Sequence, residues 1–388
     1  MTLVIYADPA VQSSAGIELY TRELIRAAFS GEWAERTVLL TGERAALDPL
    51  LGRLGCAGAP VVETRLSARA LRYAWTFAGA PAADRLVRAK TGRRVSLVHN
   101  PYNVRTPTRD CPQAVTVHDV FISKLPELLS RRQRLTLSGA IEARALRTDG
   151  HLFTPSASTK RDVVELFGVD PGRVTVTPLG VDHSRFRPCA DEGARAGLRE
   201  RLGLPERYVL YVGSLYSRKI GLLLEAFQRV ARRFPRCKLV VVGGRESTAA
   251  GEVPFAERLR RLRLEDSVIR TGFLPAGDIP LLMSGAALFT YVSFYEGFGL
   301  SPLEAMACGA PVVISDVSSL PEVAGDAGIR VDPADAEAIA AAMESVLGDP
   351  ARAAELRARS IARAAQFTWE RTARLTFDVY ESLMRGAG

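Results

Sequence analysis

Short apolar runs alternate with amphipathic stretches along most of the chain. The first series of apolar runs lies at residues 3–6, 37–41, 95–98, 114–117 and 151–153. The spacing of apolar positions between these runs predicts helices at 17–30, 67–90, 127–147 and 156–167. Because continuous apolar runs are typical of strands buried on both faces, this alternation predicts a parallel sheet covered by helices.

A second series of the same kind follows. Its strands are expected near 207–212, 238–242, 267–271, 287–291 and 312–315. Its helices are expected near 219–234, 254–263, 301–308, 335–347 and 350–365. Between the two series, residues 185–206 are polar and rich in glycine and proline, which indicates a boundary. We therefore predict a first α/β domain at 1–185, a linker at 186–206 and a second α/β domain at 207–366.

The composition agrees with two folded domains and also indicates the cellular compartment. The chain has 388 residues, 47% of them hydrophobic and 24% charged, which suits two cores. The five cysteines show no paired spacing, and no apolar stretch reaches about 18 residues. The start of the chain also resembles a first strand rather than a signal segment. We expect a reduced, cytoplasmic protein that does not span a membrane.

The formal net charge of +8 decides little by itself. It is compatible with an anionic substrate, an anionic membrane surface or nucleic acid. No nucleic-acid-binding module is recognisable, so nucleic acid is not an expected partner. Residues 65–77 combine arginines with aromatic side chains and could lie on an anionic bilayer at the inner face of the membrane. The alternative is a helix packed on the first sheet with its arginines in solvent.

The most informative motif is a pair of glutamates, Glu296 and Glu304, eight positions apart across a glycine-flanked turn. A buried strand precedes the turn and a helix follows it. We predict that Ser301 caps this helix and that Glu304 closes a capping box. The unpaired N–H groups of the helix start favour an anionic group, above all a phosphate. Taken singly, Glu304 could be only a capping acid and Glu296 only a solvated loop acid.

The segment from Glu296 to Gly328 closely resembles the nucleotide-sugar-binding half of retaining glycosyltransferases of family 4. These enzymes have the GT-B fold, in which two Rossmann-like, doubly wound α/β domains face a central cleft. The resemblance implies that Glu304 binds the ribose hydroxyls and that Glu296 faces the donor sugar. It implies that four turn residues lie along the diphosphate and the sugar: Gly297, Phe298, Gly299 and Leu300. It also implies that residues 367–388, which include an amphipathic stretch, cross back to the first domain as a helix; an ordinary terminal helix is the alternative.

In the first domain, the resemblance points to Gly16 and to the pair His118 and Asp119. Gly16 ends a reduced glycine-rich loop that approaches donor phosphate and acceptor in the family, although small residues before a helix are usually only a turn. His118 and Asp119 follow an apolar strand and match the family's His-Asp pair near the point of sugar transfer. A structural role is the alternative for both, and Asp119 could merely orient the loop or the imidazole. His99 is a weaker candidate at another strand end.

In the second domain, the resemblance places Lys219 on the donor diphosphate. A cation at a helix start opposes the helix dipole and needs an anion nearby. Many family members also have an arginine where this chain has Ser214, so either Arg218 substitutes or Lys219 and the helix start act alone. Three further strand ends belong to the donor site by resemblance, with the nucleobase near the third: Gly213, Gly243, and Phe273 with Leu274. Simple tight turns are the alternative.

The predicted reaction is transfer of a sugar from a nucleotide-sugar donor to a hydroxyl of a glycan, a glycolipid or a small molecule, with His118, Asp119 and Glu296 as catalytic residues. No Asp-x-Asp or His/Cys ligand cluster occurs, so we expect neither a metal nor another cofactor. GDP-mannose is the preferred donor, because the glutamate motif is most similar to mannosyltransferases of polysaccharide assembly; UDP-sugars remain open. The alternatives are a non-transferase GT-B enzyme, such as a sugar-nucleotide epimerase, and a nucleotide-sugar-binding module without catalysis. A dinucleotide oxidoreductase is disfavoured because no GxGxxG follows the first strand.

Overall fold

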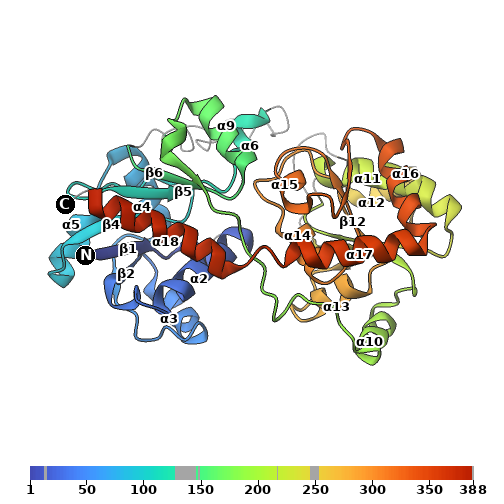
Figure 1. The fold of residues 1–388 in the computed structure, drawn as a ribbon, viewed down its shortest axis with the longest axis horizontal. Helices are drawn as coiled ribbons and strands as arrows, with labels where there is room; N and C mark the ends of the chain where they lie inside the picture. The colour runs from blue at the N-terminus through green and yellow to red at the C-terminus, as the bar shows by residue number, and fades with distance from the viewer. Residues whose placement is uncertain (13–14, 127–145, 147–148, 216, 245–252, 387–388) are drawn as a thin grey trace. The chain divides into compact units, whose positions relative to one another are not determined.

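The computed structural model describes residues 1–12, 15–126, 146, 149–215, 217–244 and 253–386, which fall into two compact units (Figure 1). The first unit contains the described residues up to Gly180 together with helix α18 (Trp369–Gly386). The second unit contains those from Val181 to Thr368. Each unit is a parallel sheet with helices, as the alternation of apolar and amphipathic stretches predicts. The helix expected at 127–147 lies almost entirely outside the described residues.

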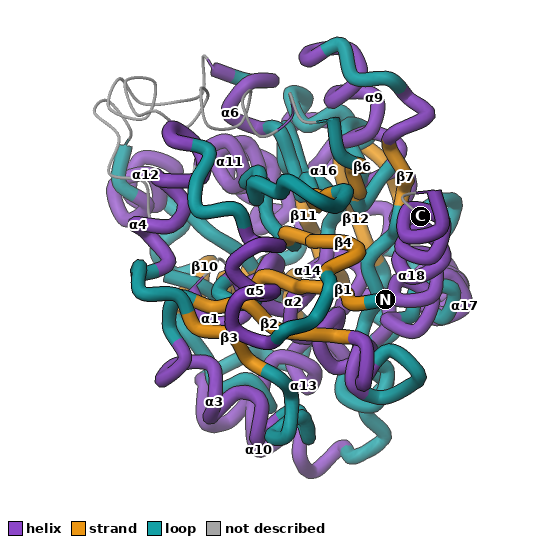
Figure 2. Tube along the Cα trace, turned by 90° about the vertical axis from the view of Figure 1, so that its left-hand side faces the viewer, coloured by secondary structure: helices purple, strands orange, loops and turns teal. Residues whose placement is uncertain are grey.

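The sheet of the first unit has seven strands in the order β3-β2-β1-β4-β5-β6-β7, all parallel. Figure 2 labels most of these strands, from β3 and β2 to β6 and β7. The strands are β1 (Thr2–Tyr6), β2 (Thr37–Thr41), β3 (Val61–Glu63), β4 (Val95–Asn100), β5 (Gln113–Thr116), β6 (His151–Thr154) and β7 (Val174–Val176). The described helices are α1 (Pro9–Gln12), α2 (Ala15–Phe29), α3 (Arg44–Arg53), α4 (Ala68–Tyr73), the π-helix η2 (Ala74–Ala78), α5 (Ala83–Thr91), α6 (Phe121–Lys124) and α9 (Ala157–Phe167), with 3-10 turns η1 (Ala34–Arg36) and η4 (Pro171–Arg173).

The sheet of the second unit has six strands in the order β10-β9-β8-β11-β12-β13, again all parallel. The strands are β8 (Tyr208–Val212), β9 (Lys238–Val242), β10 (Val268–Gly272), β11 (Leu288–Tyr291), β12 (Val312–Ser315) and β13 (Ile329–Val331). The described helices are α10 (Glu192–Leu202), α11 (Ser217–Arg233), α12 (Phe255–Leu262), α13 (Asp278–Gly285), α14 (Leu300–Ala307), α15 (Leu320–Ala324), α16 (Ala336–Leu347) and α17 (Pro350–Ala364).

Two expectations from the sequence are wrong in detail. The helix expected at 67–90 is interrupted between η2 and α5, because Gly79 adopts a left-handed conformation and Pro81 has no N–H to donate. The polar residues 186–206, expected to be a linker, contain helix α10. Asp191 caps that helix by accepting from Ala194 N–H, and Gly203 ends it.

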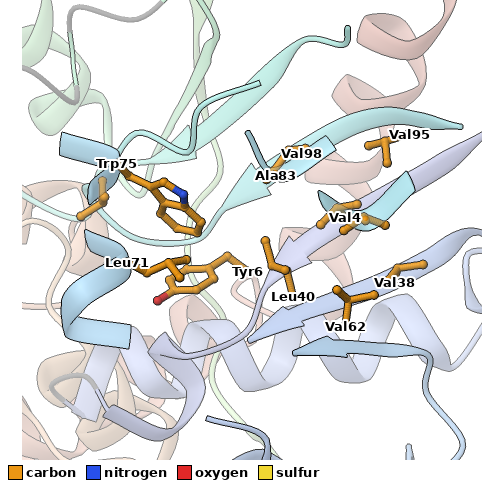
Figure 3. Close-up of a cluster of buried hydrophobic side chains, with 12 residues drawn as sticks. Val4, Tyr6, Val38, Leu40, Val62, Leu71, Trp75, Ala83, Val95 and Val98 are labelled. Atoms are coloured by element: carbon orange, nitrogen blue, oxygen red, sulfur yellow. The ribbon is translucent and has the colours of Figure 1, made fainter. Parts of the chain in front are cut away.

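A cluster of buried side chains fastens α4 and η2 to the first sheet (Figure 3). Leu71 and Trp75 pack on Tyr6 of β1, and the rings of Trp75 and Tyr6 meet edge to face with centroids 4.9 Å apart. The Trp75 indole N–H donates to the carbonyl of Pro81. The face of α4 that holds Leu71 is therefore fixed against the core, which leaves the opposite face available to line a site.

Helix α18 is joined to the first sheet by buried polar contacts. Tyr380 hydroxyl and His99 Nδ1 share a hydrogen bond, and His99 Nε2 is 2.8 Å from Thr116 Oγ1. Near the start of the helix, Thr372 hydroxyl donates to Pro178 O (2.6 Å). Burial lowers the pKa of His99 to about 3, so both ring nitrogens are engaged in a neutral, structural network.

Backbone segments meet closely where β8 and β9 end. Gly213 N–H donates to Val242 O, and Gly243 N–H donates to Gly272 O. Gly243 has φ +129°, and a Cβ atom there would overlap the carbonyl oxygen of Gly213. Only glycine fits this position, because the obstructing atom belongs to the backbone and cannot move aside.

We expect Gly243→Ala to lower the free energy of unfolding by at least about 3 kcal/mol, through overlap added to backbone strain. Gly272→Ala is the matched control: its φ is +72° but no atom lies within 4 Å of the added Cβ, so a cost of about 1 kcal/mol is expected. Denaturant unfolding of both variants measures the difference. Equal losses would contradict the close approach at Gly243.

Candidate active site

The predicted site residues lie beyond the carboxyl ends of strands where the strand order reverses. That reversal occurs between β1 and β4 in the first unit and between β8 and β11 in the second. In open parallel sheets, ligands bind beyond the strand ends at such switch points. Gly16 and His118 follow β1 and β5, whereas Gly213 and Glu296 follow β8 and β11. Each unit therefore presents its own candidate site.

In the second unit, hydrogen bonds from a neighbouring loop fix the segment that carries Glu296. Hydroxyls of Ser318 and Ser319 both donate to the carbonyl of Glu296. Ser318 Oγ in turn accepts from Glu296 N–H (3.0 Å). The Tyr291 hydroxyl donates to Glu296 Oε1 (3.2 Å), and its ring stacks on Tyr211 of β8. The carboxylate of Glu296 is thus held directly over the switch point.

Helix α14 begins differently from the prediction. Its N-cap is Gly299, with φ +114°, and no side chain caps the helix. Ser301 lies inside the first turn, so the expected capping box with Glu304 does not form. A side chain at position 299 would lie 2.6 Å from Leu320 Cδ2, which leaves room only for glycine. The N–H groups at this helix start have no side-chain cap and keep their capacity to bind an anion.

The turn residues before α14 differ in what they expose. Phe298 is buried, and its ring packs edge to face on Phe367 with centroids 5.9 Å apart. Its carbonyl oxygen lies 2.7 Å from Ser319 Oγ, whose single proton is shared with the carbonyl of Glu296. The side chain of Phe298 therefore anchors the turn, and Gly297 and Leu300 on either side are only partly buried.

Glu304 projects from α14 into a confined and only partly exposed position. Burial raises the pKa of its carboxyl to about 7, and the nearby Arg185 guanidinium opposes that shift. Within the described part of the chain, no hydrogen-bond donor reaches the Glu304 carboxylate. Arg185, whose Nη2 donates to Ala276 O (2.6 Å), carries no motif and was missed from the sequence. A desolvated acceptor with free lone pairs suits a ligand that brings two hydroxyl donors.

The remaining donor-site candidates surround the same strand ends. Arg218 and Lys219 are the second and third residues of α11, and their side chains lie outside what the structure describes. Ser214 replaces the expected arginine, and its carbonyl accepts from Tyr211 hydroxyl (2.7 Å). Phe273 is 82% exposed, and its ring lies against Gly244, where an added Cβ would be 3.0 Å from the ring. Leu274 beside it is partly buried.

In the first unit, His118 is held in one orientation. Its backbone N–H donates to Asn103 Oδ1 (2.9 Å), and its Nε2–H donates to Pro101 O (2.9 Å). Burial lowers the pKa of His118 to about 4, although the Pro101 bond opposes the shift. Because Nε2 carries the proton of this neutral ring, Nδ1 is an acceptor.

Asp119 mainly shapes the loop that follows. Its Oδ1 accepts from Phe121 N–H (3.1 Å), and its carbonyl accepts from Asn103 Nδ2 (2.7 Å). Asn103 thus fixes both His118 and Asp119 from the loop after β4. No sequence motif marks Asn103, because the contact joins two separate strand ends.

His118 and Asp119 open into a cavity of about 310 Å³. The cavity collects residues that follow β1, β3, β4 and β5, as expected at a switch point. The other lining residues are Ile17, Arg69, Arg72, Tyr73, Thr76, Tyr102, Asn103, Val104 and Ile122. Gly16 directly precedes Ile17 in α2. The basic residues of α4 were considered from the sequence only as a membrane surface or as solvated charges, not as part of this cavity.

Comparison with known proteins identifies both units. Residues 15–185 match the family model "Glycosyltransferase Family 4", and residues 197–367 match "Glycosyl transferases group 1". Sucrose-phosphate synthase from Thermosynechococcus elongatus has a similar fold, with a TM-score of 0.75 and 23% identity over the full length of both chains. Fold and site together define a GT-B glycosyltransferase.

Curated relatives agree with these matches. O-antigen chain mannosyltransferase B of Escherichia coli is 33% identical over 292 residues, which is 74% of each chain. D-inositol 3-phosphate glycosyltransferase of Kineococcus radiotolerans is 32% identical over 62% of this chain, and the match spans 58% of that protein. This chain therefore belongs to glycosyltransferase family 4, as the glutamate motif predicted. None of its described helices is both long and apolar enough to cross a membrane.

The raised pKa of Glu304 predicts a pH-dependent stability. The folded protein keeps a proton near pH 7 that the unfolded chain releases near its ordinary pKa of 4.5, so stability falls as pH rises from about 4.5 to 7. Glu304→Gln should therefore exceed the parent in free energy of unfolding above pH 7, by about 1–3 kcal/mol, and match it near pH 4.

Denaturant unfolding across this pH range measures the effect. The exposed Glu265→Gln is the control and should follow the parent protein at every pH. If Glu304→Gln and Glu265→Gln gave the same profile, the buried, uncompensated state of Glu304 would be refuted.

Proposed function

We propose that this glycosyltransferase is a retaining, metal-independent enzyme that transfers mannose from GDP-mannose to an acceptor hydroxyl. The main support for a donor site is that the Glu304 carboxylate is confined and has no hydrogen-bond partner among the described residues. A nucleotide ribose supplies two neighbouring hydroxyl donors that fit such an acceptor. Phe273 offers an exposed ring at the end of β10 for the nucleobase.

Mannose is favoured by the relationship to O-antigen chain mannosyltransferase B. The D-inositol 3-phosphate glycosyltransferases share less of their length with this chain. The relationship to the mannosyltransferase also favours a role of this enzyme in the assembly of a polysaccharide. The sugar and the base are the parts of the proposal that a ligand panel tests first.

The leaving diphosphate needs positive charge in a confined site. The uncapped start of α14 supplies partial positive charge, and Lys219 at the start of α11 supplies a full one. Among the described residues, no three His, Cys, Asp or Glu side chains converge on a point that could hold a metal ion. We assign charge stabilisation to these groups and to no cofactor.

His118 acts on the sugar as an orienting group and not as the base. A pKa of about 4 makes the ring a weak base near neutral pH. Its Nδ1 lone pair can accept a hydrogen bond from a sugar hydroxyl and so fix the sugar at the reacting position. The acceptor proton then passes to a donor phosphate oxygen as the sugar bond to that phosphate breaks, with attack from the same face, which retains the configuration.

The exposed side of α4 and η2 suits peripheral contact with an anionic membrane. Tyr73 and Phe77 are each 44% exposed, and their rings stack with centroids 6.2 Å apart. Leu66 and Arg65 beside them are exposed too. Exposed aromatic side chains next to arginine are typical of interfacial segments.

A thermal-shift panel of GDP, UDP and ADP, each with and without its sugar, tests the donor. A ligand at about 100 times its Kd stabilises the folded state by roughly 2.7 kcal/mol. We expect GDP and GDP-mannose to raise the melting temperature most. A larger shift with a uridine ligand would reassign the base, and no shift with any nucleotide would contradict the transferase proposal.

Variants separate binding from turnover. Glu304→Gln and Lys219→Ala should weaken nucleotide binding by roughly tenfold or more, because each removes a charged contact to the ligand. His118→Ala should keep nucleotide affinity but lower kcat by roughly 10- to 100-fold, through misplacement of the sugar. Calorimetric titration and steady-state transfer measure the two effects, and the melting temperature of each free variant checks folding. Equal behaviour of all three variants would show that the roles are wrongly assigned. If the parent protein consumed the donor without transferring its sugar to any acceptor, a non-transferase enzyme would be favoured.

A further inference from the structure

Helix α4 and η2 turn a basic face toward the cavity that contains His118. Arg69, Arg72 and Thr76 line that cavity and follow helical spacing. On the other face of the same segment, Leu71 and Trp75 are buried in the core. The arginines are therefore held at the cavity by a segment whose opposite face, with Leu71 and Trp75, packs on the sheet; Figure 3 shows these two buried side chains.

The guanidinium groups of Arg69 and Arg72 are not paired with an acid among the residues that the structure describes. Neither Arg69 nor Arg72 makes an ion pair or a side-chain hydrogen bond with any residue described. Some other arginines of the same unit are paired, as Arg22 is with Glu18, Arg44 with Asp48 and Arg85 with Asp110. Like charges three positions apart on a helix repel each other. Both arginines are exposed, so this pair is accessible to an anion from solvent.

Asp119, the acid that lines this cavity, accepts a hydrogen bond from the backbone of its own loop. Its Oδ1 atom accepts from Phe121 N–H (3.1 Å). Arg69 and Arg72 are the basic side chains of this lining, and the uncharged residues beside them include Thr76, Val104 and Asn103. Within the described lining, the balance of charge is positive.

A neighbouring cavity of about 200 Å³ extends this positive lining. Thr76 of η2 lines both cavities, and the second cavity adds Arg105 and Arg109. The Arg105 Nε atom is buried and has no hydrogen-bond partner among the residues described. A buried guanidinium nitrogen of this kind can donate to an acceptor that a ligand supplies.

We propose that the acceptor substrate is a phosphorylated sugar, with its phosphate on Arg69 and Arg72 and its reacting hydroxyl toward His118. This inference rests on the transferase function proposed above and specifies the acceptor class. A phosphate monoester carries about −1.5 to −2 charges, which two guanidinium groups match better than the single charge of a carboxylate. Guanidinium also binds phosphate in a bidentate geometry. The volume of about 310 Å³ is at the lower end for small-molecule sites and suits one phosphorylated sugar.

The test compares binding of mannose with binding of mannose 1-phosphate and mannose 6-phosphate by calorimetry. The full chain is kept saturated with GDP, so that the donor diphosphate site does not bind the probe. We expect at least one sugar phosphate to bind about tenfold or more tightly than mannose, since contacts to charged groups are the stronger ones. Arg69→Gln/Arg72→Gln should abolish that preference.

Arg88→Gln is the matched control, because Arg88 is an exposed arginine of α5 outside both cavities. It should bind sugar phosphates as the parent does. GDP affinity and melting temperature, unchanged in the double variant, would show that folding and the donor site are intact. If the parent bound no nucleotide, the transferase proposal would fail; if GDP bound normally but phosphate gave no preference, only the acceptor inference would be affected.

A second arm decides whether the phosphate belongs to a free sugar or to a lipid headgroup. Flotation with phosphatidylcholine vesicles that contain phosphatidylinositol 4-phosphate, whose headgroup carries a phosphate monoester on a polyhydroxyl ring, is compared with vesicles that at equal total charge contain phosphatidylglycerol, which has neither. Preferential binding to phosphatidylinositol 4-phosphate that is lost in Arg69→Gln/Arg72→Gln and kept in Arg88→Gln assigns a lipid-linked acceptor. The proposal is overturned if neither the soluble sugar phosphates nor the phosphatidylinositol 4-phosphate vesicles distinguish the double variant from Arg88→Gln.

Discussion

The second unit is organised around a carboxylate that the protein itself does not satisfy. Glu304 lies on α14 among groups that desolvate it, with the Arg185 guanidinium as the opposing charge. The helix that carries it can start where it does because Gly299 takes a backbone conformation that other residues avoid and leaves space for Leu320. The confined acid and the uncapped helix start therefore share one short segment. A ribose and a diphosphate, joined in one ligand, fit this pair of neighbouring groups.

This arrangement is unfavourable for the empty protein. A carboxyl with a raised pKa loses stability when it ionises, and an uncapped helix start leaves N–H groups without side-chain partners. In the first unit, Arg69 and Arg72 likewise have no ion-pair partner among the described residues. Such uncompensated groups are expected at binding sites, where the ligand supplies the missing partner.

Much of the fold follows from the sequence, because continuous apolar runs mark parallel strands and glycines mark their ends. The longer strands, such as β1, β2 and β9, lie where the apolar runs predicted them. The three-residue strands β3, β7 and β13 were missed, since so few residues give no distinctive pattern. The cap of α14 was misplaced because the choice between Ser301 and Gly299 depends on Leu320, which arrives from another part of the chain. The glutamate pair was recognisable as a motif, whereas Asn103 and Arg185 act through contacts between separate strand ends, and Arg69 and Arg72 lie on a helix whose exposed face the sequence alone did not assign to a cavity.

A crystal structure of the chain with bound GDP would show whether Glu304 binds the ribose. Both ribose hydroxyls should lie within hydrogen-bond distance of the Glu304 carboxylate, with the diphosphate at the start of α14. A nucleotide bound elsewhere, or a ribose that leaves Glu304 without a partner, would contradict this assignment of Glu304.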